Sequence, residues 1–172
     1  KMSGATLWHG SPPPLSAAPK RGRPLNRLRE QAVSAVVLGN SSIGEVFTPD
    51  FLCEWILERS GIVQAFLDGA TIIDPTCGDG AFLRALVRIA RKTKKIRGPD
   101  LARLTGVELS KMNLDNFRFK FRKEFPELPF QSVNTIRADF FDWQDPQRFD
   151  IFVGNPPWLN FADLPQNYKP RI

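Results

Sequence analysis

The chain has 172 residues, enough to bury one hydrophobic core, and its apolar fraction of 42% is typical of a globular protein and excludes a fibrous or disordered one. The net charge is +6, and residues 84–123 hold 13 basic and 3 acidic residues, which is compatible with a nucleic-acid partner. No apolar run reaches the ~20 residues that span a bilayer, so we expect a soluble, cytoplasmic protein with no membrane contact.

Scarce residue types exclude further chemistries. Cys53 and Cys77 lie far apart and show no CxxC or Cys/His spacing, so neither a disulfide framework nor a zinc site is predicted. The single histidine, His9, lies in a Pro-rich segment, which excludes mechanisms that need an imidazole base or ligand. We therefore expect no bound metal.

The first part of the chain is predicted to be an arm followed by helices. Residues 1–25 are rich in Pro, Ser and Ala and lack periodicity, which is typical of a flexible arm. Residues 26–38 show helical periodicity, which GNSS at 39–42 interrupts.

A second helix is predicted to begin near residue 48. Thr48 is a suitable N-cap, and Pro49 suits the first helical position. Apolar residues then follow at helical spacing. Those expected to face inward are Phe51, Leu52, Trp55 and Ile56.

From residue 70 onward, short apolar strands alternate with helical segments. The predicted strands are 70–74, 104–109, 133–139 and 149–155. Helical periodicity marks residues 81–95 and 114–125, although Phe117, Phe119 and Phe121 also alternate as in a strand. Along one side of the helix at 81–95 runs a basic stripe, which we expect to be its solvated side. The stripe comprises Arg84, Arg88, Arg91 and Lys95.

Buried strands that alternate with helices predict an α/β fold with a parallel sheet. Ligands of such folds bind at the carboxyl ends of the strands. Each predicted strand has a polar residue at its last or next-to-last position there, and we expect the four to share a pocket. These residues are Asp74, Glu108, Asp139 and Asn155.

The turn PTCGDG, residues 75–80, follows the first of these strands. Its glycines allow a ligand close to the backbone, and the helix start supplies free N–H groups. The acids around it would repel a pyrophosphate, so it suits a ligand with a cationic end, such as an ammonium or a sulfonium. A plain Asp/Gly-rich connection is the alternative. Glu108 is placed either to accept ribose hydroxyls or to be a solvated loop residue.

Five motifs follow one another in order: FTP (47–49), DPTCGDG (74–80), VELS (107–110), ADFF (138–141) and NPPW (155–158). Together they resemble the class I S-adenosylmethionine-dependent methyltransferases, specifically the N6-adenine DNA methyltransferases of restriction-modification type. The resemblance covers about residues 44–160. Enzymes that methylate adenine in ribosomal RNA or glutamine in proteins share the Asn-Pro-Pro-aromatic motif and stay as alternatives, whereas FTP favours DNA adenine.

The resemblance implies a Rossmann-like sheet, S-adenosylmethionine as cofactor and double-stranded DNA as substrate. The residues that it assigns to the cofactor are Phe47, Thr48, Pro49, Asp74, Thr76, Cys77, Gly78, Gly80, Glu108, Asp139 and Phe140. The residues that it assigns to the target adenine are Asn155, Pro156, Pro157 and Trp158.

The chemistry agrees with this assignment. The adenine amine is a poor nucleophile because its lone pair delocalises into the ring. The Asn155 side-chain oxygen and the Pro156 carbonyl would accept its two N–H groups and draw the lone pair back to nitrogen, while the prolines keep both acceptors rigid. Trp158 offers a face on which a flipped base can stack. Methyl transfer then depends on positioning and needs no histidine.

A second resemblance concerns PKRGRPLNR, residues 19–27, which is similar to the AT-hook. It implies that Arg21 and Arg23 bind the narrow minor groove of A·T-rich DNA. A solvated linker is the alternative for this segment. For the whole chain, a noncatalytic DNA-binding module is an alternative function.

The resemblance is incomplete, because such enzymes continue well past NPPW, whereas 14 residues follow Trp158 here. We expect a sheet of about four strands in which residues 149–155 form an exposed edge. The chain is interpreted as part of a larger enzyme, as half of a split enzyme completed by a partner chain, or as a truncated relic. The expected regions are a basic arm (1–25), a helical region with FTP (26–68) and a partial methyltransferase domain (69–172).

Overall fold

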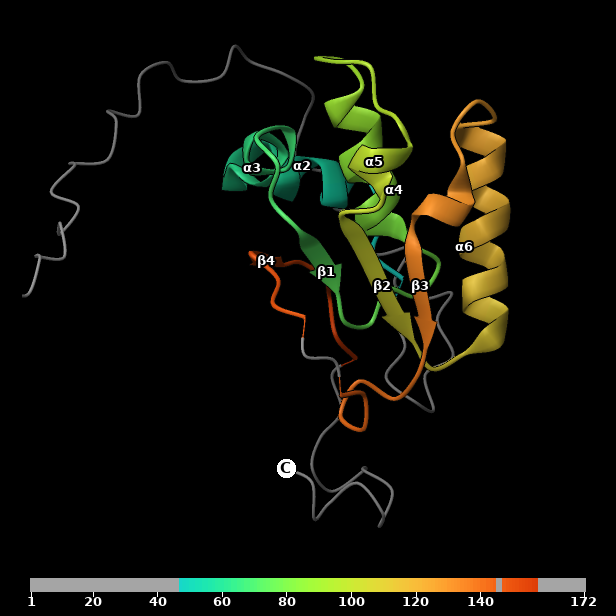
Figure 1. Cartoon of the computed structure of the whole chain (residues 1–172). Coiled ribbons are helices and arrows are strands. Elements are labelled where there is room, and N and C mark those ends of the chain that lie inside the picture. Colours follow the sequence, from blue (N-terminus) through green and yellow to red (C-terminus); the bar gives the residue numbers. More distant parts are fainter. Residues whose placement is uncertain (1–46, 145–146, 158–172) are drawn as a thin grey trace, which may run out of the picture.

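The computed structural model describes residues 47–144 and 147–157 (Figure 1). The predictions for the arm, for the helix at 26–38 and for Arg21, Arg23 and Trp158 fall outside these residues. Within the two described ranges, no helix is long and apolar enough to cross a bilayer.

In the described part of the chain, four parallel strands form one sheet in the order β3-β2-β1-β4. The strands are β1 (Ile72–Asp74), β2 (Leu104–Glu108), β3 (Asn134–Arg137) and β4 (Ile151–Phe152). The predicted α/β fold with a parallel sheet is confirmed. Because the strands are parallel, their carboxyl ends lie at one edge of the sheet, where the arrowheads point in Figure 1.

Among the described residues β4 is an edge strand, as predicted, and Phe152 on it is 61% exposed. Its register beside β1 is set by Asp150, whose carboxylate accepts hydrogen bonds from the backbone N–H and the hydroxyl of Thr71, both at 2.8 Å. Pairing continues one residue past the strand, because the Val153 N–H donates to the Ile73 carbonyl at 2.9 Å. This register determines where the segment that follows β4 begins.

Helices connect the strands and enclose the core with them. They are α2 (Asp50–Ser60), α3 (Ile62–Leu67), α4 (Ala81–Ala90), α5 (Gly98–Leu101), α6 (Lys111–Glu124) and the 3₁₀ helix η2 (Phe130–Ser132). Phe117, Phe121 and Phe125 are buried and pack edge to face, whereas Phe119 is 67% exposed. The helical prediction for this segment is therefore correct, and the alternative of a strand is wrong.

Helix α2 differs from its prediction in its start and its orientation. Pro49, not Thr48, is the N-cap. Cys53 and Leu57 are the fully buried residues of this helix, whereas Trp55 is 53% exposed and was wrongly expected to face inward. Apolar residues are so dense in this segment that their spacing does not identify one buried face.

The prediction that the basic stripe is solvated holds for Arg91 and Lys95, which are exposed, but is wrong for Arg84 and Arg88 of α4. Arg84 is buried, with 5% of its surface exposed, and its guanidinium pairs with Asp50 of α2 and Glu124 of α6 at 3.2 and 3.1 Å. Arg88 pairs with the same two carboxylates. These two arginines thus form an ionic contact among three helices.

Candidate functional site

The carboxyl edge of the sheet gathers the strand-end residues. Asp74 closes β1 and Glu108 closes β2, and the parallel register places Asp74 beside Gly106. Asp139 follows β3, and Asn155 follows β4. The structure therefore brings all four predicted residues to one edge, with β3 and β4 at its two ends.

Asp74 is the most deeply buried of these groups, with 2% of its surface exposed. Its Oδ1 accepts a hydrogen bond from the Thr76 backbone N–H at 3.2 Å. A Cβ at Gly154 would lie 2.5 Å from the same oxygen, so only glycine leaves room here. Burial, and to a smaller extent the charge of Glu108, raise the pKa of Asp74 to about 7 against the opposing hydrogen bond from Thr76.

Gly154 was missed by the sequence analysis, although a signal was present. It directly precedes Asn155 at the end of a strand, where glycine commonly marks a close approach of another group. In the structure that group is the Asp74 carboxylate at the end of β1, which lies against Gly154.

Glu108 holds the glycine turn in place. Its Oε2 accepts a hydrogen bond from the Gly78 backbone N–H at 2.9 Å, and its Oε1 accepts one from the Ser110 N–H at 2.7 Å. The turn is also anchored to β2, because the Cys77 N–H donates to the Val107 carbonyl at 2.9 Å. Gly78 itself has a φ of 54°, a conformation that favours glycine.

Two of the residues assigned to the cofactor, Gly80 and Cys77, pack against the hydrophobic core. A side chain on Gly80, whose φ is 76°, would overlap the Phe117 ring. The Cys77 sulfur lies against Gly106, and burial raises the pKa of this thiol well above its usual value, so the thiol stays neutral. Gly80 and Cys77 thus support the turn from the side of the core.

Asp79, between the two glycines of the turn, was counted among the acids available to a cationic ligand. The structure corrects this, because its carboxylate is buried and pairs with Lys120 of α6 and with Arg84 at 4.0 Å. Asp74 and Glu108 are the acids of this loop region that remain at the strand ends.

The FTP segment lies across the turn and reaches the end of β4. The Phe47 ring lies 3.5 Å from the position that a Gly78 Cβ would occupy, so it packs on the turn. The Asn155 side-chain amide donates a hydrogen bond to the Thr48 hydroxyl at 3.3 Å, although these residues are 107 positions apart. Pro49 caps α2, and its carbonyl accepts hydrogen bonds from the first turn of that helix.

The segment after β3 forms a compact turn. The Asp139 Oδ1 accepts a hydrogen bond from the Phe141 N–H at 3.0 Å, and the Asp139 carbonyl accepts one from the Trp143 N–H at 2.9 Å. The Phe140 ring is half-buried and lies 6.3 Å from the Trp143 ring, centre to centre. At the other end of the edge, Pro156 and Pro157 are exposed.

One polar atom in this region lacks a partner. Among the described residues, Thr76 Oγ1 is the buried side-chain oxygen or nitrogen that makes no hydrogen bond. Such atoms are rarely left unpaired in native proteins unless a ligand or water satisfies them. With the buried Asp74 carboxylate beside it, this hydroxyl fits a ligand that carries both a positive charge and hydrogen-bonding groups. No group of three or more potential metal ligands occurs within the described part of the chain.

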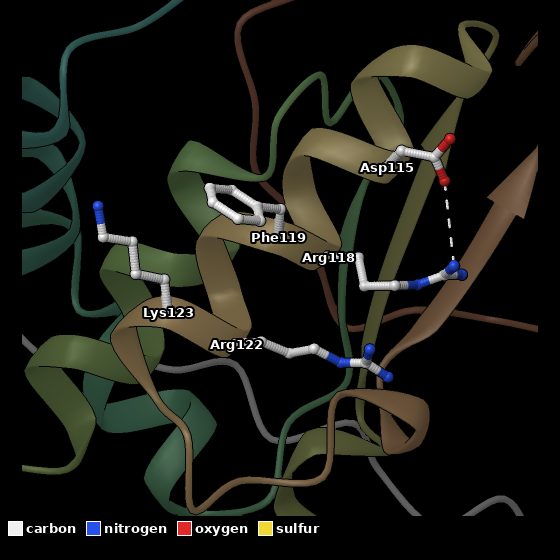
Figure 2. Close-up of a pocket in the computed structure, with 5 residues that line it drawn as sticks. All are labelled: Asp115, Arg118, Phe119, Arg122 and Lys123. Carbon is white, nitrogen blue, oxygen red and sulfur yellow. Dashed lines mark ion pairs between the residues drawn. The ribbon is translucent and has the colours of Figure 1, made fainter.

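A hollow of about 420 Å³ lies elsewhere, along the exposed side of α6 (Figure 2). Its lining residues are Asp115, Arg118, Phe119, Arg122 and Lys123. All five come from one helix, and none of them is a strand-end residue. The hollow is therefore separate from the candidate site.

Comparisons with known proteins agree with one another. Residues 32–168 match the N-6 DNA Methylase family. The chain is 31% identical over 117 residues to the type II methyltransferase M.TthHB8I of Thermus thermophilus. This match covers 68% of this chain and 22% of that protein. It is 25% identical over 116 residues to the type II methyltransferase M.CvrRI of Paramecium bursaria Chlorella virus XZ-6E, a match that covers 67% of this chain and 24% of that protein. The chain thus spans about a quarter of the length of these relatives.

Among solved structures, similarity is found to a chain assigned as a class I S-adenosylmethionine-dependent methyltransferase from Listeria monocytogenes. The TM-score is 0.49 at 12% identity, with 80% of this chain and 41% of that chain covered. This similarity is weaker than the agreement in sequence with the methylase family.

Proposed function

Since the chain belongs to the N-6 DNA Methylase family, we propose that it forms the cofactor-binding and catalytic-loop portion of an enzyme that methylates the N6 amine of adenine in DNA. The proposed cofactor is S-adenosylmethionine, and the proposed context is restriction-modification; the similarity to type II methyltransferases supports this proposal. The rest of the enzyme and its target-recognition region would lie in the same chain or in a partner.

The hydrogen bond between Asn155 and Thr48 carries this proposal. It joins the segment before α2 to the segment after β4, and so places the proposed base-binding residues beside the proposed cofactor-binding residues. The same bond uses the amide nitrogen of Asn155 as the donor, which fixes the rotation of the carboxamide. A fixed carboxamide presents its oxygen in one direction, as an acceptor of an adenine N–H requires.

Residues at the ends of β1 and β2 would hold the cofactor. Bound S-adenosylmethionine supplies an electrophilic methyl group on a positively charged sulfur. Asp74 provides negative charge in a buried setting, Thr76 provides the unpaired hydroxyl, and Gly78 allows close approach beneath Phe47. Glu108 would accept ribose hydroxyls while it keeps the turn in place.

Asp139 and Phe140 are proposed to bind the adenine of the cofactor, the first through a hydrogen bond and the second through its ring. They follow β3, next to β2 in the sheet, so they lie on the Glu108 side of the edge. This order along the edge suits an elongated ligand whose charged end lies at β1.

Asn155 and Pro156 would receive the target base as acceptors for its two amine hydrogens. Pro156 and Pro157 each have a fixed φ, which limits the motion of the carbonyl. Both are exposed, as a surface that contacts a flipped base must be before DNA binds. Trp158 is proposed from the sequence motif as the stacking partner.

The Thr48→Val variant should lower kcat about 5- to 10-fold, because it removes one hydrogen bond that orients Asn155. Valine keeps the shape of threonine, so cofactor affinity should change much less than kcat. Single-turnover methylation rates and cofactor titrations measure the two quantities. The Thr48→Ser variant retains the hydroxyl and should stay near wild type. Equal rates for the valine and serine variants would show that this bond does not orient the amide.

Transfer of tritiated methyl groups tests the proposed substrate. The complete protein is incubated with labelled S-adenosylmethionine and with unmethylated DNA, ribosomal RNA or a protein mixture. Label is expected in DNA, at N6 of adenine. Label in RNA or protein, and not in DNA, would contradict DNA as the substrate and identify the alternative substrate. DNA binding without cofactor binding or transfer would favour the noncatalytic alternative.

A further inference from the structure

Arg84 is a buried charged residue that the proposed mechanism leaves without a role. Its side chain is 7% exposed, and it is the one arginine of α4 that is buried. The guanidinium contacts three parts of the chain. Nη2 lies 3.2 Å from Asp50 Oδ1, Nη1 lies 3.1 Å from Glu124 Oε2, and Nε donates to the Asp79 carbonyl at 3.4 Å.

Two of these contacts belong to the segments that would enclose the cofactor. Asp50 is the first residue of α2 and directly follows the FTP segment. Asp79 lies inside the glycine turn, between Gly78 and Gly80. The third contact, Glu124, ends α6 on the other side of the guanidinium and belongs to neither segment.

We propose that Arg84 is a positioning residue for the cofactor site, because it ties the FTP segment to the glycine turn through Asp50 and Asp79. This inference depends on the proposed function. A guanidinium presents its donors in one rigid plane, so its partners are held at fixed positions relative to each other. The two segments meet where Phe47 packs on Gly78, and a shift of α2 would move Phe47 away from the turn.

Arg88 reinforces the same connection from the next turn of α4. It pairs with Asp50 at 3.0 Å and also with Glu54, one turn further along α2. Asp50 and Glu54 are four residues apart, as are Arg84 and Arg88, so two consecutive turns of each helix face each other. The N-terminal half of α2 is thus held in position along its length by charge pairs.

Asp50 and Glu124 make a matched pair for the test. Each pairs with both Arg84 and Arg88, so Asp50→Asn and Glu124→Gln remove equivalent charges from the same two guanidinium groups. The Asp50 side chain is 46% exposed and that of Glu124 is 23% exposed. If the network served stability alone, loss of the more buried Glu124 should be the more damaging change.

The measurement is the Kd of S-adenosylmethionine for the complete protein, with the melting temperature of each variant recorded alongside. We expect Asp50→Asn to weaken binding about 10-fold, since it releases a charged hydrogen-bond network beside the FTP segment. Glu124→Gln should weaken binding less than about 3-fold, even if it lowers the melting temperature as much or more.

Equal weakening by the two variants, or greater weakening by Glu124→Gln, would overturn the positioning role and leave Arg84 a residue of the fold. That result is distinct from failure of the proposed function, in which the wild-type protein itself would not bind S-adenosylmethionine. In the second case the inference fails together with the function.

Discussion

The Asn155→Ala variant should bind S-adenosylmethionine almost as tightly as the wild type and transfer methyl groups about 10²- to 10³-fold more slowly. The reason is that the Asn155 carboxamide is proposed to accept a hydrogen bond that strengthens as the adenine nitrogen attacks, so its loss affects the transition state more than the bound cofactor. Single-turnover transfer to unmethylated DNA measures the rate, and calorimetric titration measures cofactor affinity.

Asn134→Ala is the matched control for this prediction. Asn134 begins β3, at the amino end of that strand, and its side chain donates to the Ala102 carbonyl at 3.0 Å. The same change of residue type there should leave the transfer rate near wild type. If Asn155→Ala keeps its full rate, or loses cofactor affinity in proportion to rate, Asn155 does not act on the target base.

The Asp74→Asn variant should bind S-adenosylmethionine about 10²-fold more weakly, because it removes the buried negative charge proposed to hold the positive end of the cofactor. The effect should depend on pH. Since burial raises the pKa of Asp74 to about 7, a positively charged ligand must first displace a proton below that pH. Wild-type affinity should therefore rise between pH 5.5 and about 7.5, whereas the variant should show little such rise.

Thermal unfolding without ligand tests the same group independently. The pKa of folded Asp74, about 7, lies above its ordinary value of 3.8, so the native state binds a proton that the unfolded chain has released. The contribution of Asp74 to the free energy of unfolding is therefore fully present below about pH 3.8. It is lost as the pH rises through about 7, and the loss is at most about 4 kcal/mol.

The difference in stability between the wild type and Asp74→Asn at each pH separates this effect from those of other carboxylates. Hydrogen bonds from Thr71 hold the pKa of Asp150 below its ordinary value, so Asp150 contributes stability at neutral pH that is lost in acid. The wild type should lose stability relative to Asp74→Asn as pH rises from 5 to 8. A constant difference across that range, together with pH-independent cofactor affinity, would contradict a raised pKa at Asp74.

Local sequence features were sufficient to predict the parallel sheet and the polar residues at its carboxyl edge. Apolar strand segments that end in a polar residue and alternate with helices have few compact arrangements other than a parallel sheet. Asp74 and Glu108 end their strands and Asn155 follows β4 within a few residues, so their placement at one edge follows from strand direction alone.

The orientation of α2 could not be predicted in the same way. Its apolar residues occur on several sides, and the buried face proved to contain Cys53 and Leu57. Asp50 and Glu54 lie on that side as well, turned toward the arginines of α4. The partners on this face lie 34 positions away in the sequence, and no local pattern identifies such a partner.

The sequence by itself thus determined the strands, their direction and the chemical character of the residues at their ends, because these depend on neighbours along the chain. The tertiary structure decided which of those residues meet: Thr48 with Asn155, Gly154 with Asp74, and Asp79 with Lys120 instead of the ligand side. Contacts of this kind depend on how separate elements pack, and packing is set by the shapes and charges of segments distant in sequence.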